Sequence, residues 1–405
     1  PLPRGCGTHH ARATCPQNDG IESFGRMSHR SALGGKTGVR QTILCAGAAI
    51  VLAFIPSRQH IPVRGNRGER IVKAYRIHRY GGPECATFDD GVPEPKPRPN
   101  DLIVKVSGAS LNPVDYKTRL GAVRVLFRPK LPAVFGNDLS GEVVAVGSAV
   151  TRFKAGDRII ACSRITEMGS FAEIARIDQG CASPPPQTVD LATASALPLA
   201  GQTAQQVLRD LLHVRPGMHV LITAGAGGVG CFAIQLAKIM GAEVTTTASS
   251  RGEALVRAMG ADHVIDYTKT ELASVGRKFD AVFDLAGGET LEACFRVAKP
   301  GTTVVSIAGL PTPSTVSKEL GMGTGLKALF WLASFGLRRK ARANGVSYHY
   351  YFLHPRSADL SELVAMVDAG TLKIVVDKSF SFEKIADAMA HLEAGHAKGK
   401  VVVTL

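Results

Sequence analysis

Residues 219–240, HVLITAGAGGVGCFAIQLAKIM, constrain the fold of this chain more than any other stretch. The apolar start predicts a buried strand, and apolar residues recur at helical spacing after it. Between the two, Gly225, Gly227 and Gly230 stand in G-x-G-x-x-G register. Glycines in such a turn let the backbone approach a pyrophosphate, and the helix N-terminus offers partial positive charge. We therefore expect a dinucleotide site at Gly225, Ala226, Gly227, Gly228, Val229 and Gly230; a flexible glycine-rich loop is the alternative.

The chain after this helix keeps alternating between strand and helix patterns. We expect strands over residues 242–249, 263–267, 279–285, 302–308 and 347–353, and helices over 253–259 and 290–298. Alternating strands and helices are typical of an α/β domain with a doubly wound parallel sheet.

The end of the second of these strands indicates which dinucleotide is bound. An NAD-binding domain places Asp or Glu about 20 residues after the glycines, where it holds the ribose 2′-hydroxyl. Here residues 245–251 read TTTASSR, and no carboxylate occurs before Glu253. Hydroxyls and a guanidinium suit a 2′-phosphate, so Ser249 and Arg251 predict NADPH as the cofactor. An ordinary exposed turn is the alternative for this segment.

The positive charge of the chain is uneven. Of the net charge of +14, residues 1–70 contribute a surplus of seven, so the other 335 residues carry only seven more. Beyond residue 70 the one dense basic cluster is 338–342, RRKAR. We interpret this cluster as a solvated helix end, with a partner or nucleic-acid patch as the alternative.

Residues 1–70 resemble a targeting segment and are excluded from the fold. Thirteen apolar residues at 43–55 follow Lys36 and Arg40, and Pro56 follows Phe54 closely before a second basic stretch. Thirteen residues are too few to span a bilayer but suit a signal. The arrangement is similar to the bipartite plastid presequences of algae with complex plastids. A mitochondrial or secretory address and translated upstream sequence are the alternatives, with Met27 as a possible start; a cytoplasmic location is also left open.

The eight cysteines show no C-x-x-C pair and no clustering of the kind that metal ligands show. This pattern predicts free thiols in a reducing compartment and argues against a structural zinc site.

The half before the glycine motif is rich in strand patterns. We expect strands over residues 71–80, 101–107, 142–146, 157–161 and 170–175, and a helix over 196–212 that leads into the cofactor domain. At 405 residues the chain has room for two domains. We place them at 71–195 for the β-rich domain and 196–354 for the cofactor domain, with 355–405 as a return segment.

Four motifs, taken in their order along the chain, indicate a resemblance to one protein family. They are NPVDYKTRLG at 112–121, FGNDLSGEV at 135–143, ALPLAGQTA at 196–204 and AGAGGVG at 224–230. The chain resembles the zinc-independent medium-chain dehydrogenase/reductases, in the quinone oxidoreductase and alkenal/enone reductase branch, over about residues 71–405. The resemblance implies a Rossmann domain plus a GroES-like catalytic domain to which the C-terminal segment returns.

The residues that zinc-dependent relatives use are missing. The first two motifs, which we take to be loops, offer Asn112, Asp115, Tyr116, Asn137 and Asp138, but no Cys or His. Since zinc prefers thiolate and imidazole ligands, no metal is expected.

The resemblance also implies a set of site residues. Tyr116 and Lys117 become candidates for catalysis, with Asp115 as a partner of Arg119 or Lys117; the alternative for Tyr116 is that it only packs. The implied cofactor contacts, beyond the glycine turn, Ser249 and Arg251, are Asn112, Lys117, Thr203, Tyr267, Leu285, Ala308 and Phe352.

Residues 311–343 form a longer connection than usual, with an apolar helix expected over 326–337. This helix is either a lid over the substrate or a helix that packs in the core or in a dimer contact. The tail predicts helices over 360–367 and 382–392 and a strand over 400–405.

Together these observations predict an NADPH-dependent reductase of quinones or α,β-unsaturated carbonyls. Its expected partners are a small-molecule substrate and a second copy of the chain, without nucleic acid and without a membrane span in the mature chain. The alternatives are a non-catalytic NADPH-binding structural or nucleic-acid-binding protein on this fold, and a zinc-type alcohol dehydrogenase.

Overall fold

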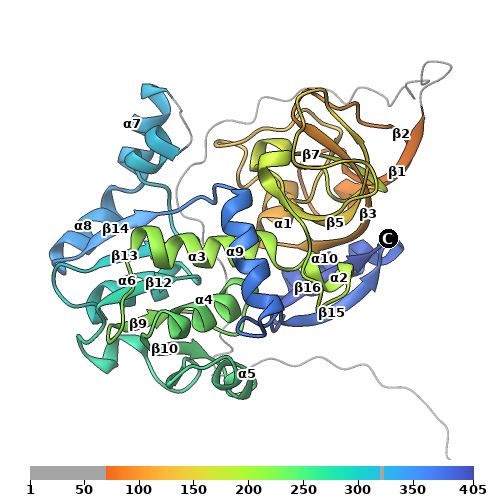
Figure 1. Cartoon of the computed structure of the whole chain (residues 1–405). Helices are drawn as coiled ribbons and strands as arrows, with labels where there is room; N and C mark the ends of the chain where they lie inside the picture. The colour runs from red at the N-terminus through yellow and green to blue at the C-terminus, as the bar shows by residue number, and fades with distance from the viewer. Residues whose placement is uncertain (1–69, 320–322) are drawn as a thin grey trace, which may run out of the picture. The chain divides into compact units, whose positions relative to one another are not determined.

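The half of the chain that carries the glycine motif is built on a six-stranded sheet in which all neighbouring strands run parallel. A computed structural model of the chain describes residues 70–319 and 323–405. The strand order is β11-β10-β9-β12-β13-β14, so the chain winds outward from β9 in one direction and then from β12 in the other (Figure 1). The bounds are β9 His219–Ile222, β10 Glu243–Ala248, β11 His263–Asp266, β12 Ala281–Asp284, β13 Thr303–Ser306 and β14 Ser347–Tyr350.

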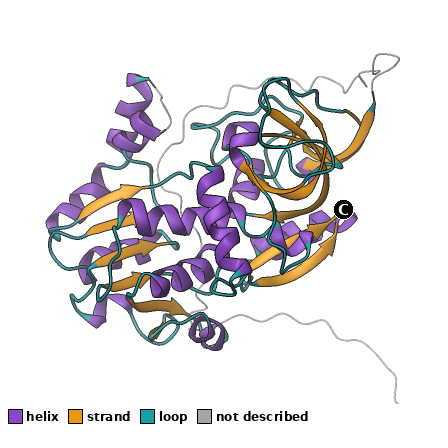
Figure 2. Cartoon of the chain, viewed as in Figure 1, coloured by secondary structure: helices purple, strands orange, loops and turns teal. Residues whose placement is uncertain are grey.

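Each face of this sheet is covered by its own helices (Figure 2). Along β9, Val220 and Ile222 share a core with helices α3, α4, α5 and α9, whereas Leu221 between them shares another core with α6 and α8. Alternate side chains of a strand point to opposite faces, so both faces are buried, as a parallel sheet requires. The doubly wound α/β fold predicted from the sequence is confirmed. The bounds are α3 Pro198–Gln206, α4 Gly228–Ile239, α5 Glu253–Ala258, α6 Gly288–Val297, α8 Phe335–Ala343 and α9 Ser357–Asp368.

The other half is a mostly antiparallel β structure. A seven-stranded sheet has the order β15-β16-β3-β5-β6-β8, with β7 also beside β3, and a three-stranded sheet has the order β2-β1-β4. The bounds are β1 Ile71–Ile77, β2 Ala86–Pro93, β3 Asp101–Leu111, β4 Ala133–Val134, β5 Asp138–Val146, β6 Arg158–Cys162, β7 Ile174–Asp178, β8 Ala182–Ser183, β15 Val376–Ser381 and β16 Lys400–Thr404.

The C-terminal segment contacts both halves of the chain. Its helix α9 adds Leu360, Leu363 and Val367 to the core that α3 and α4 share. Its last strand, β16, pairs antiparallel with β3, and α10, Ile385–Glu393, packs beside these strands. The C-terminal segment therefore links the cofactor half to the β-rich half.

Several elements differ from the sequence-based expectation. Residues 112–121, taken to be a loop, contain the helix α1, Pro113–Arg119, and a short helix α2, Leu191–Ala194, was not expected. Strands β2 and β15 were missed because their sequences, ATFDDGVP and VDKSFS, are polar and lie at sheet edges, where burial does not impose an apolar pattern. The helix expected over 326–337 is two helices, α7 Thr324–Ala333 and α8, which meet at Ser334.

Candidate functional site

Except for Asn112, Lys117 and Thr203, the predicted cofactor residues lie at one edge of the parallel sheet. Each of the six strands is followed, within a few residues of its carboxyl end, by one or more of them. In the spatial order of the strands these residues are Tyr267 after β11, Ser249 and Arg251 after β10, Gly225 to Gly230 after β9, Leu285 after β12, Ala308 after β13 and Phe352 after β14. In doubly wound folds ligands bind outside the carboxyl ends of the strands, where the winding direction reverses, here between β9 and β12.

The glycine turn forms a cradle in which Gly225 and Gly230 leave no room for a larger residue. A Cβ on Gly225 would lie 2.0 Å from Thr246 Oγ1, and a Cβ on Gly230 would lie 2.5 Å from the Ala224 carbonyl oxygen. Helix α4 begins at Gly228 and has no side-chain cap at its N-terminus. Backbone N–H groups at an uncapped helix start suit a pyrophosphate. The residues present therefore fit a dinucleotide.

The three threonines of β10 do not face the cofactor edge. Thr245 Oγ1 lies 2.7 Å from His219 Nε2, Thr246 Oγ1 donates to the Ile222 carbonyl, and Thr247 Oγ1 accepts the Ala224 N–H. Their hydroxyls therefore hold the sheet and the glycine turn together. Only the last three residues of the TTTASSR segment therefore remain available to bind a 2′-phosphate.

The turn after β10 also contacts an acidic residue. Ser250 Oγ donates to Asp266 Oδ2, and Lys269 Nζ lies 3.3 Å from the same oxygen. Hydrogen bonds from Ser250 and Thr268 hold the pKa of Asp266 well below its ordinary value, so this carboxylate is charged and paired. Ser249 is half-buried and Arg251 is exposed on the same turn. The Arg251 guanidinium is therefore the cation on this turn that is available to bind a phosphate.

A buried charged cluster joins the β-rich half to the glycine turn. Asp138, at 0% exposure, accepts hydrogen bonds from Ser110 Oγ at 2.8 Å and from Asn112 Nδ2 at 2.9 Å, and Lys400 Nζ lies 3.2 Å from the same carboxylate. The Lys400 ammonium is also buried and donates to the Leu111 carbonyl and to Asn112 Oδ1. Both polar atoms of the Asn112 amide are thus used inside the protein. Asn112 therefore holds this cluster together.

The same cluster reaches the cofactor edge through the last strand. The Gly399 N–H donates to the Ala226 carbonyl at 2.9 Å, and a Cβ on Gly228 would lie 2.8 Å from Lys400 Cδ. Asp138 Oδ1 in turn accepts the Leu199 N–H, in the first turn of α3. Further along α3, Thr203 is buried. The cluster thus fixes the glycine turn, α3 and the start of α1 relative to one another.

Helix α1 carries both predicted catalytic residues. Asp115 Oδ2 accepts the Asn112 N–H at 2.7 Å and so caps the helix start, and Arg119 pairs instead with Glu393 of α10. The expected pairing of Asp115 with Arg119 or Lys117 is therefore wrong, because the carboxylate points to the N-terminus of its own helix. Burial raises the pKa of Asp115 to about 8, and the nearby Asp138 carboxylate contributes to this. Its Oδ1 has no hydrogen-bond partner within the described structure.

Tyr116 and Lys117 are half-buried and have different surroundings. Tyr116 packs against the apolar cluster between β16 and α10, and burial raises its pKa, with Glu393 adding to the effect. Burial lowers the pKa of Lys117. Tyr116 therefore keeps its proton at neutral pH, and the Lys117 side chain has lost part of its hydration.

A second buried carboxylate organises the turns after the central strands. Asp284, at the end of β12, accepts hydrogen bonds from Thr223 Oγ1 at 2.9 Å and Ser306 Oγ at 2.7 Å. Thr223 Oγ1 in turn accepts the N–H of Leu285, and Ser306 Oγ accepts that of Ala308. Asp284 thus fixes the backbone of two predicted cofactor residues, Leu285 and Ala308, through Thr223 and Ser306.

The described residues offer no set of metal ligands. Across 70–319 and 323–405, no three side chains of His, Cys, Asp or Glu come together as a metal would require. Cys85, Cys162, Cys181, Cys231 and Cys294 are buried free thiols, and burial raises the pKa of Cys162 and Cys294 well above its ordinary value. The donors in place thus do not fit a catalytic zinc ion.

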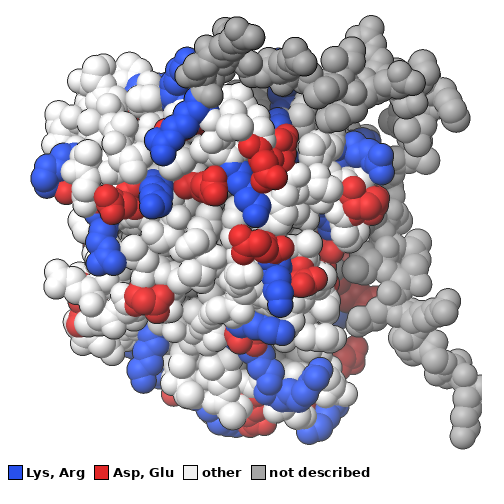
Figure 3. Space-filling view, turned by 90° about the vertical axis from the view of Figure 1, so that its right-hand side faces the viewer, with Lys and Arg blue, Asp and Glu red and all other residues white. Residues whose placement is uncertain are grey.

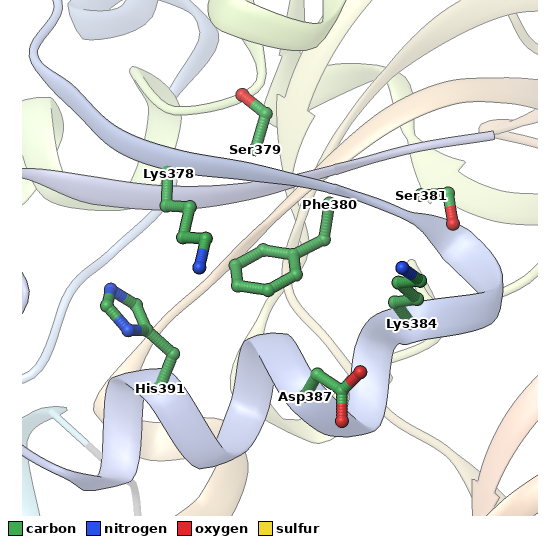
Figure 4. Close-up of a pocket in the computed structure, with 7 residues that line it drawn as sticks. All are labelled: Lys378, Ser379, Phe380, Ser381, Lys384, Asp387 and His391. Carbon is green, nitrogen blue, oxygen red and sulfur yellow. The ribbon is translucent and has the colours of Figure 1, made fainter. Parts of the chain in front are cut away.

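A well-formed pocket of the described surface lies elsewhere. It has a volume of about 580 Å³ and lies between β15 and α10, where Phe380 stands between Lys378 and Lys384 (Figure 4). His391 on its rim hydrogen-bonds Asp377 at 2.6 Å. None of the predicted site residues lines it. On the face of the molecule in Figure 3, Lys and Arg alternate with Asp and Glu and form no continuous basic patch.

Three residues that organise the site were not predicted as part of it: Lys400, Ser110 and Asp284. One signal was present for Lys400, which is a single cation directly before three valines in the strand KVVVT. A lysine in a buried strand needs a carboxylate partner, but the sequence does not say which one.

Known families and structures resemble the chain over most of its length. Residues 98–187 match the alcohol dehydrogenase GroES-like domain, and residues 259–403 match a family described as zinc-binding dehydrogenase. The chain is 34% identical to the chloroplast envelope quinone oxidoreductase homolog of Arabidopsis thaliana, over 82% of this chain and 98% of that protein. It is 35% identical to the chloroplastic NADPH-dependent alkenal/one oxidoreductase of the same plant, over 82% of this chain and 79% of that one. The structure of the quinone oxidoreductase from Coxiella burnetii superposes with a TM-score of 0.73 at 30% identity, covering 83% of this chain and all of the other.

Proposed function

Because the chain belongs to the medium-chain dehydrogenase/reductase family, in its quinone oxidoreductase and alkenal/enone reductase branch, we propose that it is an NADPH-dependent reductase of quinones or α,β-unsaturated carbonyls. The observation that carries the proposal is the coupling of the glycine cradle to the start of α1 through Gly399 and Lys400. This coupling joins a dinucleotide-shaped turn to the helix that carries Tyr116 and Lys117.

The cofactor is held in this proposal by the carboxyl edge of the sheet. Gly225 to Gly230 and the first turn of α4 take the pyrophosphate. Ser249 and Arg251 take the 2′-phosphate, with Tyr267 exposed nearby after β11. Leu285, Ala308 and Phe352 follow the three remaining strands and complete the edge, whereas Asn112 positions α1 from inside the buried cluster.

When bound, NADPH supplies a hydride for transfer to carbon or to a quinone. The protein contributes position and charge. Lys117 and Tyr116 are both donors, and negative charge that develops on a carbonyl oxygen is stabilised by donors fixed beforehand. The rigid start of α1, capped by Asp115 and anchored by Asn112, keeps these two side chains in place. Thr203 uses its hydroxyl proton on the Leu199 carbonyl, so it can only accept from a ligand.

Zinc has no part in the proposed reaction. The name of the matching family mentions zinc, but the two motifs that would supply ligands give Asn112, Asn137 and Asp138, and the last is already engaged by Lys400. A protein of the alcohol dehydrogenase type would bring stoichiometric zinc through purification, which elemental analysis detects.

The direct test is the oxidation of NADPH by the purified protein, followed by absorbance, with acrolein, a long-chain enal and benzoquinone. Turnover of at least one compound, with a lower KM for NADPH than for NADH, is the expected result. Tight NADPH binding without turnover of any compound would contradict the proposal and favour a non-catalytic binding protein.

Two substitutions test the role of α1 separately. Lys117→Ala and Tyr116→Phe should each lower kcat/KM by about tenfold or more, in the range of general acid and electrostatic contributions. Lys105→Ala, an exposed lysine on β3, is the matched control. If both α1 variants stay within about twofold of the parent protein, α1 does not take part in the chemistry.

We further propose a homodimer and a plastid location, both of which rest on the sequence. The presequence interpretation concerns residues 1–70, of which 1–69 lie outside the described residues. Light scattering tests the dimer. A fusion of residues 1–70 to a fluorescent protein tests the location, and mitochondrial import would correct it.

A further inference from the structure

The helix pair α7–α8 presents apolar side chains to solvent next to a group of cations. Leu329, Trp331, Leu332 and Phe335 are 51%, 50%, 69% and 48% exposed. Within α7 only Phe330 is buried. The helix stands away from the sheet at the upper left of Figure 1. Exposed apolar residues of this size are ordinary when scattered, but four within seven residues mark a contact surface.

The cations beside this patch have no acidic counterpart on the same segment. Residues 324–343 contain Lys327, Arg338, Arg339, Lys340 and Arg342, but no Asp or Glu. Lys340 is paired with Glu292 of α6 at 2.5 Å. Burial and the charge of Arg342 both lower the pKa of Arg338. The segment is therefore a concentrated positive surface.

The two features are joined at Trp331. The Arg338 guanidinium lies 5.6 Å from the centre of the Trp331 ring and donates to the Trp331 carbonyl at 2.7 Å. Phe335 packs beside the same ring, with centroids 5.7 Å apart. Meanwhile Ala341 is buried and Leu337 is half-buried against the core beneath α8. The base of the projection is thus fixed to the sheet, and its tip carries the aromatic and leucine side chains.

We propose that α7–α8 docks on an anionic lipid surface, with Leu329, Trp331, Leu332 and Phe335 entering the headgroup boundary and Arg339 and Arg342 contacting lipid phosphates. Helices that lie in a membrane interface combine Trp, Phe and Leu with Lys and Arg. Within the described residues, no helix has both the length and the apolarity needed to cross a bilayer, so the contact is peripheral.

Charge decides between a lipid surface and a second copy of this chain. In a two-fold symmetric contact the same patch meets itself. The exposed cations Lys327, Arg339 and Arg342 of one copy would then lie near those of the other across an apolar contact, which costs energy. Anionic phosphates instead pair with the cations while the acyl region receives the apolar side chains. The inference does not depend on the reductase activity.

The experiment uses Trp331, which is the only tryptophan of the chain. Full-length protein is mixed with vesicles of phosphatidylcholine alone and of phosphatidylcholine with phosphatidylglycerol, and tryptophan emission and co-sedimentation are both measured. We expect a blue shift and sedimentation with the anionic vesicles and little of either with the neutral ones. Because residues 1–70 are also basic, emission separates docking of α7 from binding by that segment.

Two variants and a control sharpen the result. Arg339→Gln with Arg342→Gln should weaken the emission response to anionic vesicles by about tenfold or more, since each cation near the surface contributes to binding. Leu329→Gln with Leu332→Gln should abolish the blue shift. Lys105→Gln with Arg158→Gln, two exposed cations of the β-rich half, changes the net charge equally and should leave the response intact.

Three outcomes would overturn the proposal. One is sedimentation without any change in Trp331 emission. Another is an emission shift that the arginine variant and its control reduce to the same extent. The third is a blue shift that appears with rising protein concentration in the absence of vesicles, which would show that a second copy covers the patch.

Discussion

Cations are buried and paired in the cluster around Lys400, but they are exposed on the projecting helix pair α7–α8. Lys400 is 3% exposed and has three oxygen partners, one of them the Asp138 carboxylate. Lys327, Arg339 and Arg342 are exposed, on a segment without acids. A buried charge must be paired within the protein, and an exposed one remains available to a partner. The first region therefore holds the site together, and the second is open to an external surface.

The largest expected effect compares the same substitution in both regions. Lys400→Met leaves Asp138 as a buried carboxylate without its cation and should lower the free energy of unfolding by about 3–5 kcal/mol. Lys327→Met on α7 should change it by less than about 0.5 kcal/mol. Urea unfolding at neutral pH measures both.

A double variant tests why Lys400→Met should lower the free energy of unfolding. Replacing both charges, as in Lys400→Met with Asp138→Asn, should restore part of the stability, because an uncompensated buried charge is the main cost. If the double variant is as unstable as the sum of the singles, the pairing is not what stabilises this region.

A second comparison uses glycine. Gly225→Ala places a Cβ 2.0 Å from Thr246 Oγ1, and such overpacking should cost about 1–3 kcal/mol and weaken NADPH binding. On α7, a Cβ on Gly325 meets no atom within 4 Å. Gly325→Ala should therefore stabilise the helix by up to about 1 kcal/mol. Thermal unfolding and a fluorescence titration with NADPH measure the two effects; equal losses from both variants would contradict the close packing of the cradle.

The buried region should also respond to pH through Asp115. Its pKa is raised to about 8 in the folded protein, from an ordinary value near 4. Between these values the folded protein holds a proton that the unfolded chain has lost, so stability falls as pH rises. The slope should reach ~1.4 kcal/mol per pH unit. Asp115→Asn cannot ionise and should flatten this slope, with its largest gain near pH 8; an unchanged slope would show that Asp115 is charged in the folded protein.

Arg251 is exposed, like the cations of α7–α8, but it lies in the predicted cofactor site. Arg251→Ala should raise the KM for NADPH by about tenfold, equivalent to ~1.4 kcal/mol, because a charge-assisted contact with the 2′-phosphate is lost. The KM for NADH should stay unchanged, since NADH lacks that phosphate. A parallel rise in both constants would assign Arg251 to structure and not to cofactor selection.

The smallest effect is expected at Trp331. Its ring is half exposed, so Trp331→Gln should change the free energy of unfolding by no more than about 0.5 kcal/mol. Sedimentation with anionic vesicles should nevertheless weaken. A large loss of stability would mean that the ring belongs to a folded core and that the contrast between the two regions fails at this position.

Most of the cofactor half could be predicted because its signals are local. The glycine register, the apolar strands and the TTTASSR turn are each read from a few consecutive residues. Helix α1 was taken for a loop because its cap, the contact of Asp115 with the Asn112 N–H, lies in a segment that begins with Asn-Pro and looks like a turn. The edge strands β2 and β15 were missed for a related reason, since they carry few apolar residues.

By itself the sequence determined the alternation of strands and helices around the parallel sheet, the glycine turn and the absence of a carboxylate at the end of β10, because each depends on neighbouring residues. Only the tertiary structure decided that Lys400 pairs with Asp138, 262 residues away, that Thr245 to Thr247 point inward, and that Trp331 is exposed. Local chemistry selects backbone conformation. Which side chains lose contact with water is decided only when distant segments pack. A charge that loses its water must find a partner within the protein, whereas a charge that stays hydrated needs none.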